Sequence, residues 1–426
     1  MKKVLIVAYF FPPETVVGSQ RPYRLAKYFT RFGWEPIVLT IKRPGKPPVG
    51  IRMIETGFKD FGVTIKSMIG FDTEKGFYPQ LGVSVSKDFD HKSLKSKIIK
   101  LFKEVINFPD SKRGWYKFAL ESASEFLSKE SVDAIISTSG PVTSHLIARK
   151  LKHKYGIPWV ADLRDLWTNN HFYNKYKLTK YFEKRLELKT LSDADVLVTV
   201  THRFVDELKT LHKDKNIISI TNGYDTDDFS DTQIKLTNEF TITHTGKLYN
   251  GKRDPLLLFE VVANLINEKK LDKKLIKIRF YGFKKDWLIQ DIKKYNLEGF
   301  VDVYDFIPRK EVLKKQKESQ LLLLLIDKNN KEESVYPAKI FEYFGARRPI
   351  IGVGGNGGIV KEILKEINIG MFASNANLLR DIILKYYNEF LEYGEVKFCD
   401  NNTIENYTYD SITRKYSEVL NGLVLK

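Results

Sequence analysis

The stretch Ser334–Gly358, SVYPAKIFEYFGARRPIIGVGGNGG, constrains the fold of this chain more than any other. It follows Leu321–Ile326, an unbroken apolar run that is typical of a strand buried on both faces. Pro337 favours a helix start, Ala338–Ala346 has helical composition, and Pro349–Val353 predicts a second buried strand. A strand, a helix and a strand with short joints form a βαβ unit, which implies a parallel sheet.

Lys339 and Glu342 lie three residues apart and therefore share one face of this helix near its N-terminus. That end of a helix carries free N–H groups and a partial positive charge, which suit an anion such as phosphate. The lysine would add charge, and the glutamate would accept hydrogen bonds from sugar hydroxyls. The alternative from spacing alone is a surface ion pair.

Length and composition limit the other possibilities. With 426 residues the chain is too long for one hydrophobic core, so we expect two or three domains. The single cysteine, Cys399, excludes an intrachain disulfide framework, and the seven histidines show no metal-ligand spacing, so no metal or other cofactor is predicted. The formal net charge of +17 favours an acidic partner. Nucleic acid is the weaker choice, because no nucleic-acid motif is present and the lysines are spread widely.

The N-terminal stretch MKKVLIVAYFFPPE contains an apolar run of about eight residues without a small-residue cleavage site. It predicts a first buried strand rather than a signal peptide. No apolar stretch approaches the ~20 residues of a membrane span. We therefore expect a cytoplasmic protein, with peripheral binding to the inner face of the membrane as an open alternative.

The first half of the chain opens with a second βαβ pattern. Strands are expected at Val4–Ala8 and Glu35–Thr40, with a helix from about Gln20 to Phe32 between them. In such sheets ligands lie beyond the carboxyl ends of the strands. Gly18 would let the backbone approach a ligand closely there, with Arg21 at the helix start; a plain glycine-capped loop is the alternative.

Two further strand ends carry polar residues. His145 lies in the first turn of a helix that follows the strand Ala134–Ser137, and it should be mostly neutral near pH 7. The strand Ile157–Ala161 ends in DLRDLW, which contains Asp162, Arg164 and Asp165. Structural packing of the histidine and an internal Asp–Arg pair are the alternatives to a role at a site.

Lys92–Phe108 predicts a basic amphipathic helix, with apolar residues at helical spacing and lysines elsewhere around it. Such a helix can lie on anionic lipid, and it can equally pack its apolar face on the domain. Both interpretations stay open.

The best domain boundary is the turn Thr221–Asp225, because Asn-Gly accepts positive φ angles. A second sheet should begin with the strand Phe240–Thr245, which has Gly246 and Lys247 at its end and Lys252 and Arg253 soon after. Cations at a strand end would stabilise a diphosphate leaving group; a solvated basic turn is the alternative. We expect domains at 1–221 and 222–400, with a last helix in 401–426 that returns to the first domain.

The motifs in this order resemble glycosyltransferase family 4, the retaining sugar transferases of GT-B fold. TSGPVTSHLIA, VADLRDLW, ITNGYDTDDF, TGKLY and PAKIFEYFGARRPI carry the resemblance, which covers nearly the whole chain. It implies an α/β fold of two Rossmann-like domains facing each other across a cleft. The implied catalytic residues are His145, Asp162, Arg164, Lys247, Lys252 and Arg253. The implied donor-binding residues are Gly18, Gly246, Lys339, Glu342, Gly357 and Gly358, and those of the acceptor side are Arg21, Trp115 and Asp165.

The family often shows two glutamates eight residues apart, whereas Ser334 stands eight residues before Glu342. Glu332 or Glu333 would replace the first carboxylate, or this branch lacks it. The expected function is transfer of a sugar from a nucleotide-diphosphate sugar to a glycan or lipid-linked acceptor, in surface polysaccharide or glycolipid assembly. The alternatives are a nucleotide-sugar 2-epimerase of the same fold and a catalytically silent scaffold on the membrane surface.

Overall fold

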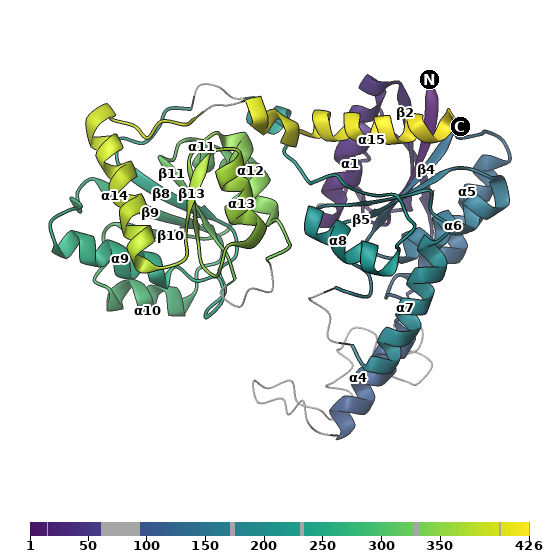
Figure 1. Cartoon of the computed structure of the whole chain (residues 1–426), viewed down its shortest axis with the longest axis horizontal. Coiled ribbons are helices and arrows are strands. Elements are labelled where there is room, and N and C mark those ends of the chain that lie inside the picture. Colours follow the sequence, from purple (N-terminus) through teal and green to yellow (C-terminus); the bar gives the residue numbers. More distant parts are fainter. Residues whose placement is uncertain are drawn as a thin grey trace. The chain divides into compact units, whose positions relative to one another are not determined.

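A computed structural model describes residues 1–14, 16–60, 94–170, 175–230, 234–327, 333–399 and 402–425 (Figure 1). The chain divides into two compact units. Unit 1 consists of Met1–Thr221 with Thr413–Lys426, and unit 2 of Asn222–Ile412. The domain boundary expected from the Asn-Gly turn falls at the same place.

Unit 1 is an α/β unit built on a parallel sheet with the strand order β3-β2-β1-β4-β5-β6-β7. Its elements are β1 (Lys2–Val7), α1 (Val17–Phe29), β2 (Trp34–Ile41), β3 (Arg52–Thr56), α4 (Leu94–Ile106), α5 (Tyr116–Leu127), β4 (Ala134–Ser139), α6 (Thr143–Tyr155), β5 (Trp159–Leu163), α7 (Lys177–Leu191), β6 (Val196–Thr199), α8 (His202–Leu211) and β7 (Ile217–Ser219). The strand order reverses between β1 and β4, where ligands bind in sheets of this kind.

Unit 2 repeats the plan with the order β10-β9-β8-β11-β12-β13, again parallel. Its elements are β8 (Phe240–Thr245), α9 (Leu256–Asn267), β9 (Ile276–Tyr281), α10 (Asp286–Lys294), β10 (Val301–Tyr304), α11 (Arg309–Lys317), β11 (Leu321–Leu325), α12 (Ala338–Ala346), β12 (Ile350–Val353), α13 (Gly358–Glu366), β13 (Gly370–Ala373) and α14 (Ala376–Tyr393). The reversal point lies between β8 and β11.

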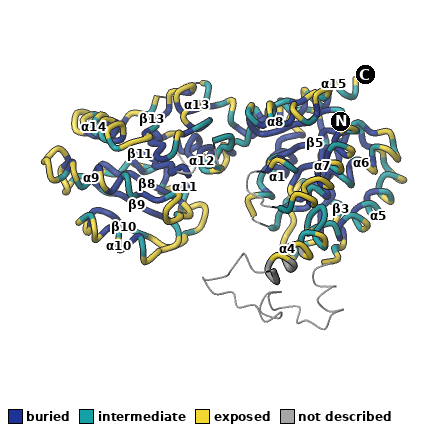
Figure 2. The backbone as a smooth tube through the Cα atoms, turned by 60° about the horizontal axis from the view of Figure 1, so that its bottom comes forward, coloured by how far each residue is buried: buried dark blue, intermediate teal, exposed yellow. Residues whose placement is uncertain are grey.

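Both sheets are the cores of their units, because apolar strands sandwiched by helices lose both faces to the interior. The central strands are dark blue, and the outer faces of the helices yellow, in Figure 2. β11 is an all-leucine strand, LLLLL, that is buried throughout. The βαβ unit β11–α12–β12 is confirmed, with Pro337 preceding the first residue of α12.

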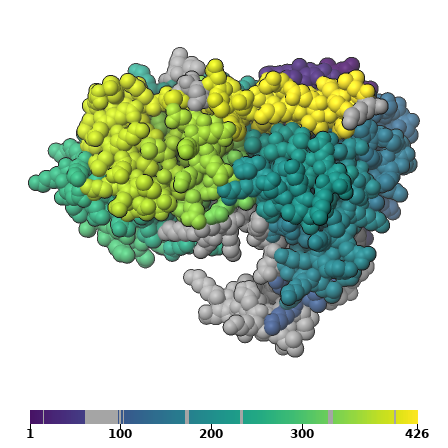
Figure 3. All heavy atoms as spheres, viewed as in Figure 1, coloured from purple at the N-terminus to yellow at the C-terminus, as the bar shows by residue number. Residues whose placement is uncertain are grey.

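The last helix, α15 (Tyr409–Val424), belongs to unit 1 from Thr413 onwards. Lys2 Nζ donates to Asn421 Oδ1 at 3.0 Å, and the yellow atoms of this helix lie beside the purple N-terminal residues in Figure 3. Within the described ranges, no helix is long and apolar enough to cross a membrane.

Candidate active site

Lys339 and His244 meet at the reversal point of unit 2. Lys339 extends from the first turn of α12, and its Nζ donates to His244 Nε2 at 3.0 Å. His244 lies on β8, and its Nδ1–H donates to the Leu323 carbonyl of β11 at 2.9 Å. Because Nε2 accepts while Nδ1 donates, the imidazole is neutral and held in one tautomer. The two strands thus place a lysine at the sheet edge where parallel sheets bind ligands.

The charge of Lys339 is finely balanced. Burial, and then the charge of the nearby Arg253, lower the pKa of the Lys339 ammonium to about 7, while the charge of Glu342 acts to raise it. Burial, and then the charge of Lys339, holds the pKa of His244 well below its usual range. An anion at this edge would face Lys339 and Arg253, and it would favour the charged form of the lysine.

A cavity of about 150 Å³ opens beside Lys339 and Glu342. Gly246 lines it with φ +104°, and a Cβ there would lie 2.9 Å from Lys339 Cε, so glycine is required by both backbone and space. The lining residues are Thr245, Gly246, Tyr281, Gly282, Phe306, Ile307, Val312, Lys339 and Glu342. This set brings the predicted donor residues Gly246, Lys339 and Glu342 together.

Glu342 is held by the helix before β11. Arg309 donates to its carboxylate and also pairs with Asp228 Oδ2 at 3.2 Å. Gln316, near the end of α11, donates to Thr245 Oγ1 at 2.9 Å and to Glu342 Oε2 at 3.4 Å. Sequence analysis missed His244, Arg309 and Gln316, because their partners come from strands and helices far away in the chain.

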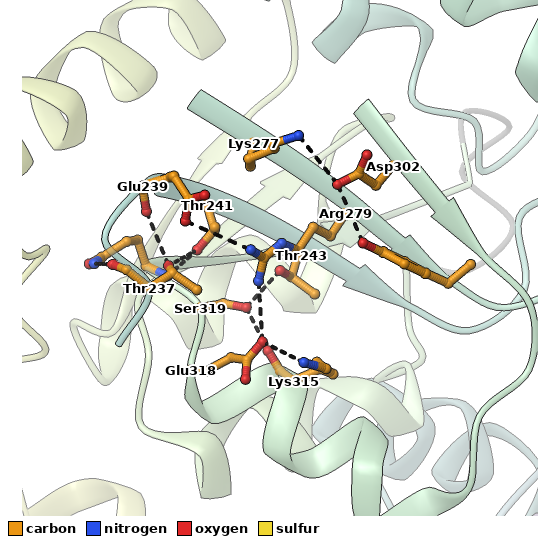
Figure 4. A network of polar contacts seen from close by, with 12 residues as sticks. Thr237, Glu239, Thr241, Thr243, Lys277, Arg279, Asp302, Lys315, Glu318 and Ser319 are labelled. Carbon is orange, nitrogen blue, oxygen red and sulfur yellow. Dashed lines mark hydrogen bonds and ion pairs between the residues drawn. The ribbon is translucent and has the colours of Figure 1, made fainter. Parts of the chain in front are cut away.

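The polar contacts in Figure 4 fix α11 to the sheet. Threonines alternate along β8, and Thr243 Oγ1 accepts from Ser319 Oγ at 2.6 Å. On the neighbouring strand, Arg279 pairs with Glu318 at 3.2 Å. Since alternate residues of a strand share a face, this stripe positions the helix whose Arg309 and Gln316 contact Glu342.

The other predicted donor-side residues have different surroundings. Lys247 Nζ lies 5.9 Å from the Phe283 ring centroid, and Lys252 is exposed, so Arg253 is the cation whose charge acts on Lys339. Gly357 precedes α13 and Gly358 is its first residue, and both lie in the left-handed region, with φ +81° and +48°. A Cβ on Gly358 would meet the Glu333 carbonyl at 2.4 Å.

The glycine turn before α13 therefore serves close packing. Ile359 N donates to the Glu333 carbonyl at 3.0 Å, and Asn356 Nδ2 donates to Glu333 Oε1 at 3.3 Å. These contacts place the carboxylate of Glu333 beside the start of α13. Glu332, the other candidate for the first glutamate, lies outside the described residues.

In unit 1, Asp162 and Arg21 form a buried pair instead of lining a site. The Arg21 Nε to Asp162 Oδ2 distance is 3.1 Å, and the two side chains are 2% and 0% exposed. Tyr416 from α15 donates to Asp162 Oδ1 at 2.8 Å and Thr138 donates to Oδ2 at 2.8 Å. Burial acts to raise the pKa of the Asp162 carboxyl, but Arg21 and these hydrogen bonds bring it below its usual range. This pair ties α1 and α15 to the sheet.

His145 and Trp115 are also core residues. His145 is fully buried, its Nδ1 lies 2.7 Å from Ser137 Oγ, and its ring packs near those of Trp159 and Trp167. Burial lowers its pKa to about 4, so the ring is neutral near pH 7 for that reason rather than because of the helix terminus. Trp115 is fully buried and its Nε1 donates to Thr56 Oγ1 at 2.8 Å. Both side chains are enclosed by the core of unit 1.

Arg164 connects backbone segments of unit 1. Its guanidinium donates to the carbonyls of Ser139, Gly140 and Gly18, the last at 2.6 Å. The helix expected from Gln20 begins earlier, at Val17, so Gly18 lies within its first turn and not in a loop. Arg164 thereby holds the start of α1 against the loop after β4.

A cavity of about 430 Å³ lies beyond β4 and β5 in unit 1. Of the predicted acceptor-side residues, the exposed Asp165 lines it, together with Ser139, Gly140 and Trp167. Asp110 also lines it and was missed by sequence analysis; it accepts from Thr143 N at 2.8 Å. The residues that the structure describes contain no group of three or more metal-ligating side chains.

Comparison with known proteins bears on both units. Residues 19–228 match the sequence model described as Glycosyltransferase Family 4. No curated protein matches the chain.

Solved structures resemble the chain over its whole length. Sucrose-phosphate synthase from Thermosynechococcus elongatus has a TM-score of 0.60 at 12% identity, with 99% of each chain covered. HepE from Anabaena, in complex with UDP and glucose, has a TM-score of 0.59 at 11% identity, covering 99% of this chain and 100% of the other. A mutant of TarM from S. aureus, in complex with Fondaparinux, alpha-GlcNAc-glycerol and UDP, gives 0.58 at 13%, with the same coverage. At such identities the likeness shows the fold, which is GT-B.

Proposed function

Because residues 19–228 match the model of glycosyltransferase family 4, we propose that this GT-B protein transfers a sugar from a nucleoside-diphosphate sugar to an acceptor, with retention of configuration. The observation that carries the proposal is the sheet edge of unit 2, where Lys339 and Arg253 act on one another beside Glu342. Structures of the same fold, HepE and the TarM mutant, were solved with UDP.

The departing diphosphate needs positive charge that is already in place. Lys339, fixed by His244, and Arg253 supply this charge at the carboxyl end of β8. Gly246 leaves the space beside Lys339 open for a phosphate. No metal is required by this arrangement, because the two cations take the role that a divalent ion would have.

Two carboxylates would hold the rest of the donor. Glu342, oriented by Arg309 and Gln316, would accept hydrogen bonds from the ribose hydroxyls. Glu333, at the start of α13, would replace the first glutamate of the family pattern and contact the donor sugar.

The acceptor would bind on unit 1. The cavity beyond β4 and β5 presents Asp165, backbone groups around Gly140 and the ring of Trp167, a mixture suited to a carbohydrate. A glycan or a lipid-linked sugar fits this chemistry, and surface polysaccharide or glycolipid assembly is the expected setting.

A screen of nucleotide sugars tests the proposal. The purified protein is incubated with UDP-, GDP- and CMP-sugars, and release of the nucleotide is measured with and without glycan and lipid-linked acceptors. We expect one nucleotide class to be released, and the anomeric configuration of the product, read by NMR, to match that of the donor. The variant Lys339→Met should lose most of the activity, whereas Lys273→Met, an exposed residue of the same unit, should keep it.

Release of no nucleotide from any donor by the folded protein would contradict the proposal and favour a scaffold. Conversion of the donor into its 2-epimer would identify an epimerase instead.

A further inference from the structure

Helices α4 and α7 of unit 1 run side by side and project from the sheet, as Figure 1 shows. They are joined by polar contacts: Tyr176 N donates to Glu104 Oε2 at 3.1 Å, and the Tyr176 hydroxyl donates to the Lys97 carbonyl at 3.2 Å. Lys100 Nζ lies 4.9 Å from the centre of the Tyr176 ring. The pair therefore forms one surface, which we call the α4–α7 face.

Large apolar side chains are exposed along this face. Leu178 is 63% exposed, Val105 60% and Phe182 52%, and Leu101, Phe102 and Tyr181 accompany them. A groove of about 710 Å³ runs between the helices and is lined by residues of both, with Phe108 and Arg113 at one end. A cluster of several large, exposed apolar side chains marks an interaction site, because its contact with water is unfavourable.

The charges around the apolar residues are sorted by sign. The exposed charged side chains of α7 are all basic: Lys177, Lys180, Lys184, Arg185 and Lys189. Its two acids, Glu183 and Glu187, are buried, and Glu183 pairs with Lys175. In α4 the one acid, Glu104, turns inward to Tyr176. The outward face of both helices thus carries cations and apolar groups.

We propose that the α4–α7 face docks on an anionic lipid bilayer, with its apolar residues in the headgroup region and its cations on the lipid phosphates. Apolar side chains flanked by lysine and arginine are the pattern that such surfaces bind. A protein partner would need a matching acidic rim, and a second copy of the same basic face would repel itself. The inference does not rest on sugar transfer, since vesicle binding is measured without substrate.

The experiment is flotation of the full chain with vesicles of phosphatidylcholine alone or with one third phosphatidylglycerol. We expect binding to the anionic vesicles that weakens as salt rises, because the screening length shrinks. The double variant Arg185→Glu/Lys189→Glu, at exposed residues that line the groove, should bind about tenfold or more weakly, since each basic residue near the surface contributes to attraction. Leu178→Ser/Phe182→Ser should weaken binding at every salt concentration.

The matched control is Lys273→Glu/Lys274→Glu, which makes the same charge change at exposed residues of unit 2 and should bind as the wild type does. Circular dichroism and nucleotide release by each variant show that the fold and the transfer site are intact. The proposal is overturned if the control loses binding equally, if neutral vesicles bind as well, or if sedimentation shows that the face instead joins two copies.

Discussion

At the scale of single residues, binding of the donor should change the protonation state of Lys339. Its folded pKa of about 7 lies below the usual value for lysine, so at pH 8 most of the protein has a neutral Lys339. A phosphate beside it favours the ammonium form. Binding of UDP or GDP at pH 8 should therefore take up close to one proton, and affinity should fall as pH rises above 7.

Calorimetric titration in two buffers of different ionisation enthalpy measures this uptake. In Lys339→Met the buffer dependence should vanish, because no other donor-side cation with a lowered pKa faces the described part of the cavity. Equal uptake by the wild type and the variant would show that the lysine is not at the phosphate.

Glu342 offers a second residue-scale prediction. If it holds the ribose hydroxyls, Glu342→Gln should weaken nucleotide binding by about 1.5–3 kcal/mol for each charged hydrogen bond lost. Arg309→Gln keeps the Glu342 carboxylate and removes only the half-exposed ion pairs of Arg309 with Glu342 and Asp228, so it should weaken nucleotide binding by about 0–1 kcal/mol. Titration of both variants separates the two roles: similar losses would mean that the pair is merely structural.

At the scale of elements, Asp162 anchors α1 and α15 to the sheet of unit 1. Asp162→Asn keeps the shape but leaves the Arg21 charge buried without its partner, which should cost about 3–5 kcal/mol of the free energy of unfolding. The matched control is Asp193→Asn, whose partners Arg149 and His153 are near the surface, and which should cost about 1 kcal/mol or less.

Urea denaturation followed by circular dichroism measures both variants. The pKa of Asp162 is lowered in the folded state, so its contribution is present above the unfolded pKa and is lost as pH falls through the folded one. The difference in the free energy of unfolding between the wild type and Asp162→Asn should therefore shrink in acid. A small, pH-independent difference would contradict the anchoring role.

The elements also show what the sequence predicts well. The helix Ala338–Ala346 was predicted with its observed bounds, because Pro337 and Pro349 frame it and the flanking strands are purely apolar. β3 was missed, since it is a polar, half-exposed strand at the edge of the sheet. The start of α1 was placed three residues late, because Gly18 resembles a loop residue yet accepts a helical conformation.

Some of the predicted site residues lie around a cavity and others are buried in the core, and the difference has a physical reason. Lys339, Glu342 and Gly246 lie around one cavity as predicted, because a strand end and a helix start determine where these residues are placed. Asp162 and Arg21 were misplaced because their burial depends on Tyr416, which is distant in sequence but adjacent in space. Charge at a strand end thus indicates a site only where no other part of the chain covers it.

At the scale of the whole molecule, we expect the donor to bind to unit 2 and the acceptor to unit 1. Hydrogen exchange of the full chain, with and without saturating UDP or GDP, tests this placement directly. We expect slower amide exchange in 245–253 and 338–346, where the backbone surrounds the cavity, and little change in the sheet of unit 1. Protection confined to unit 1, around 139–145, would contradict the account.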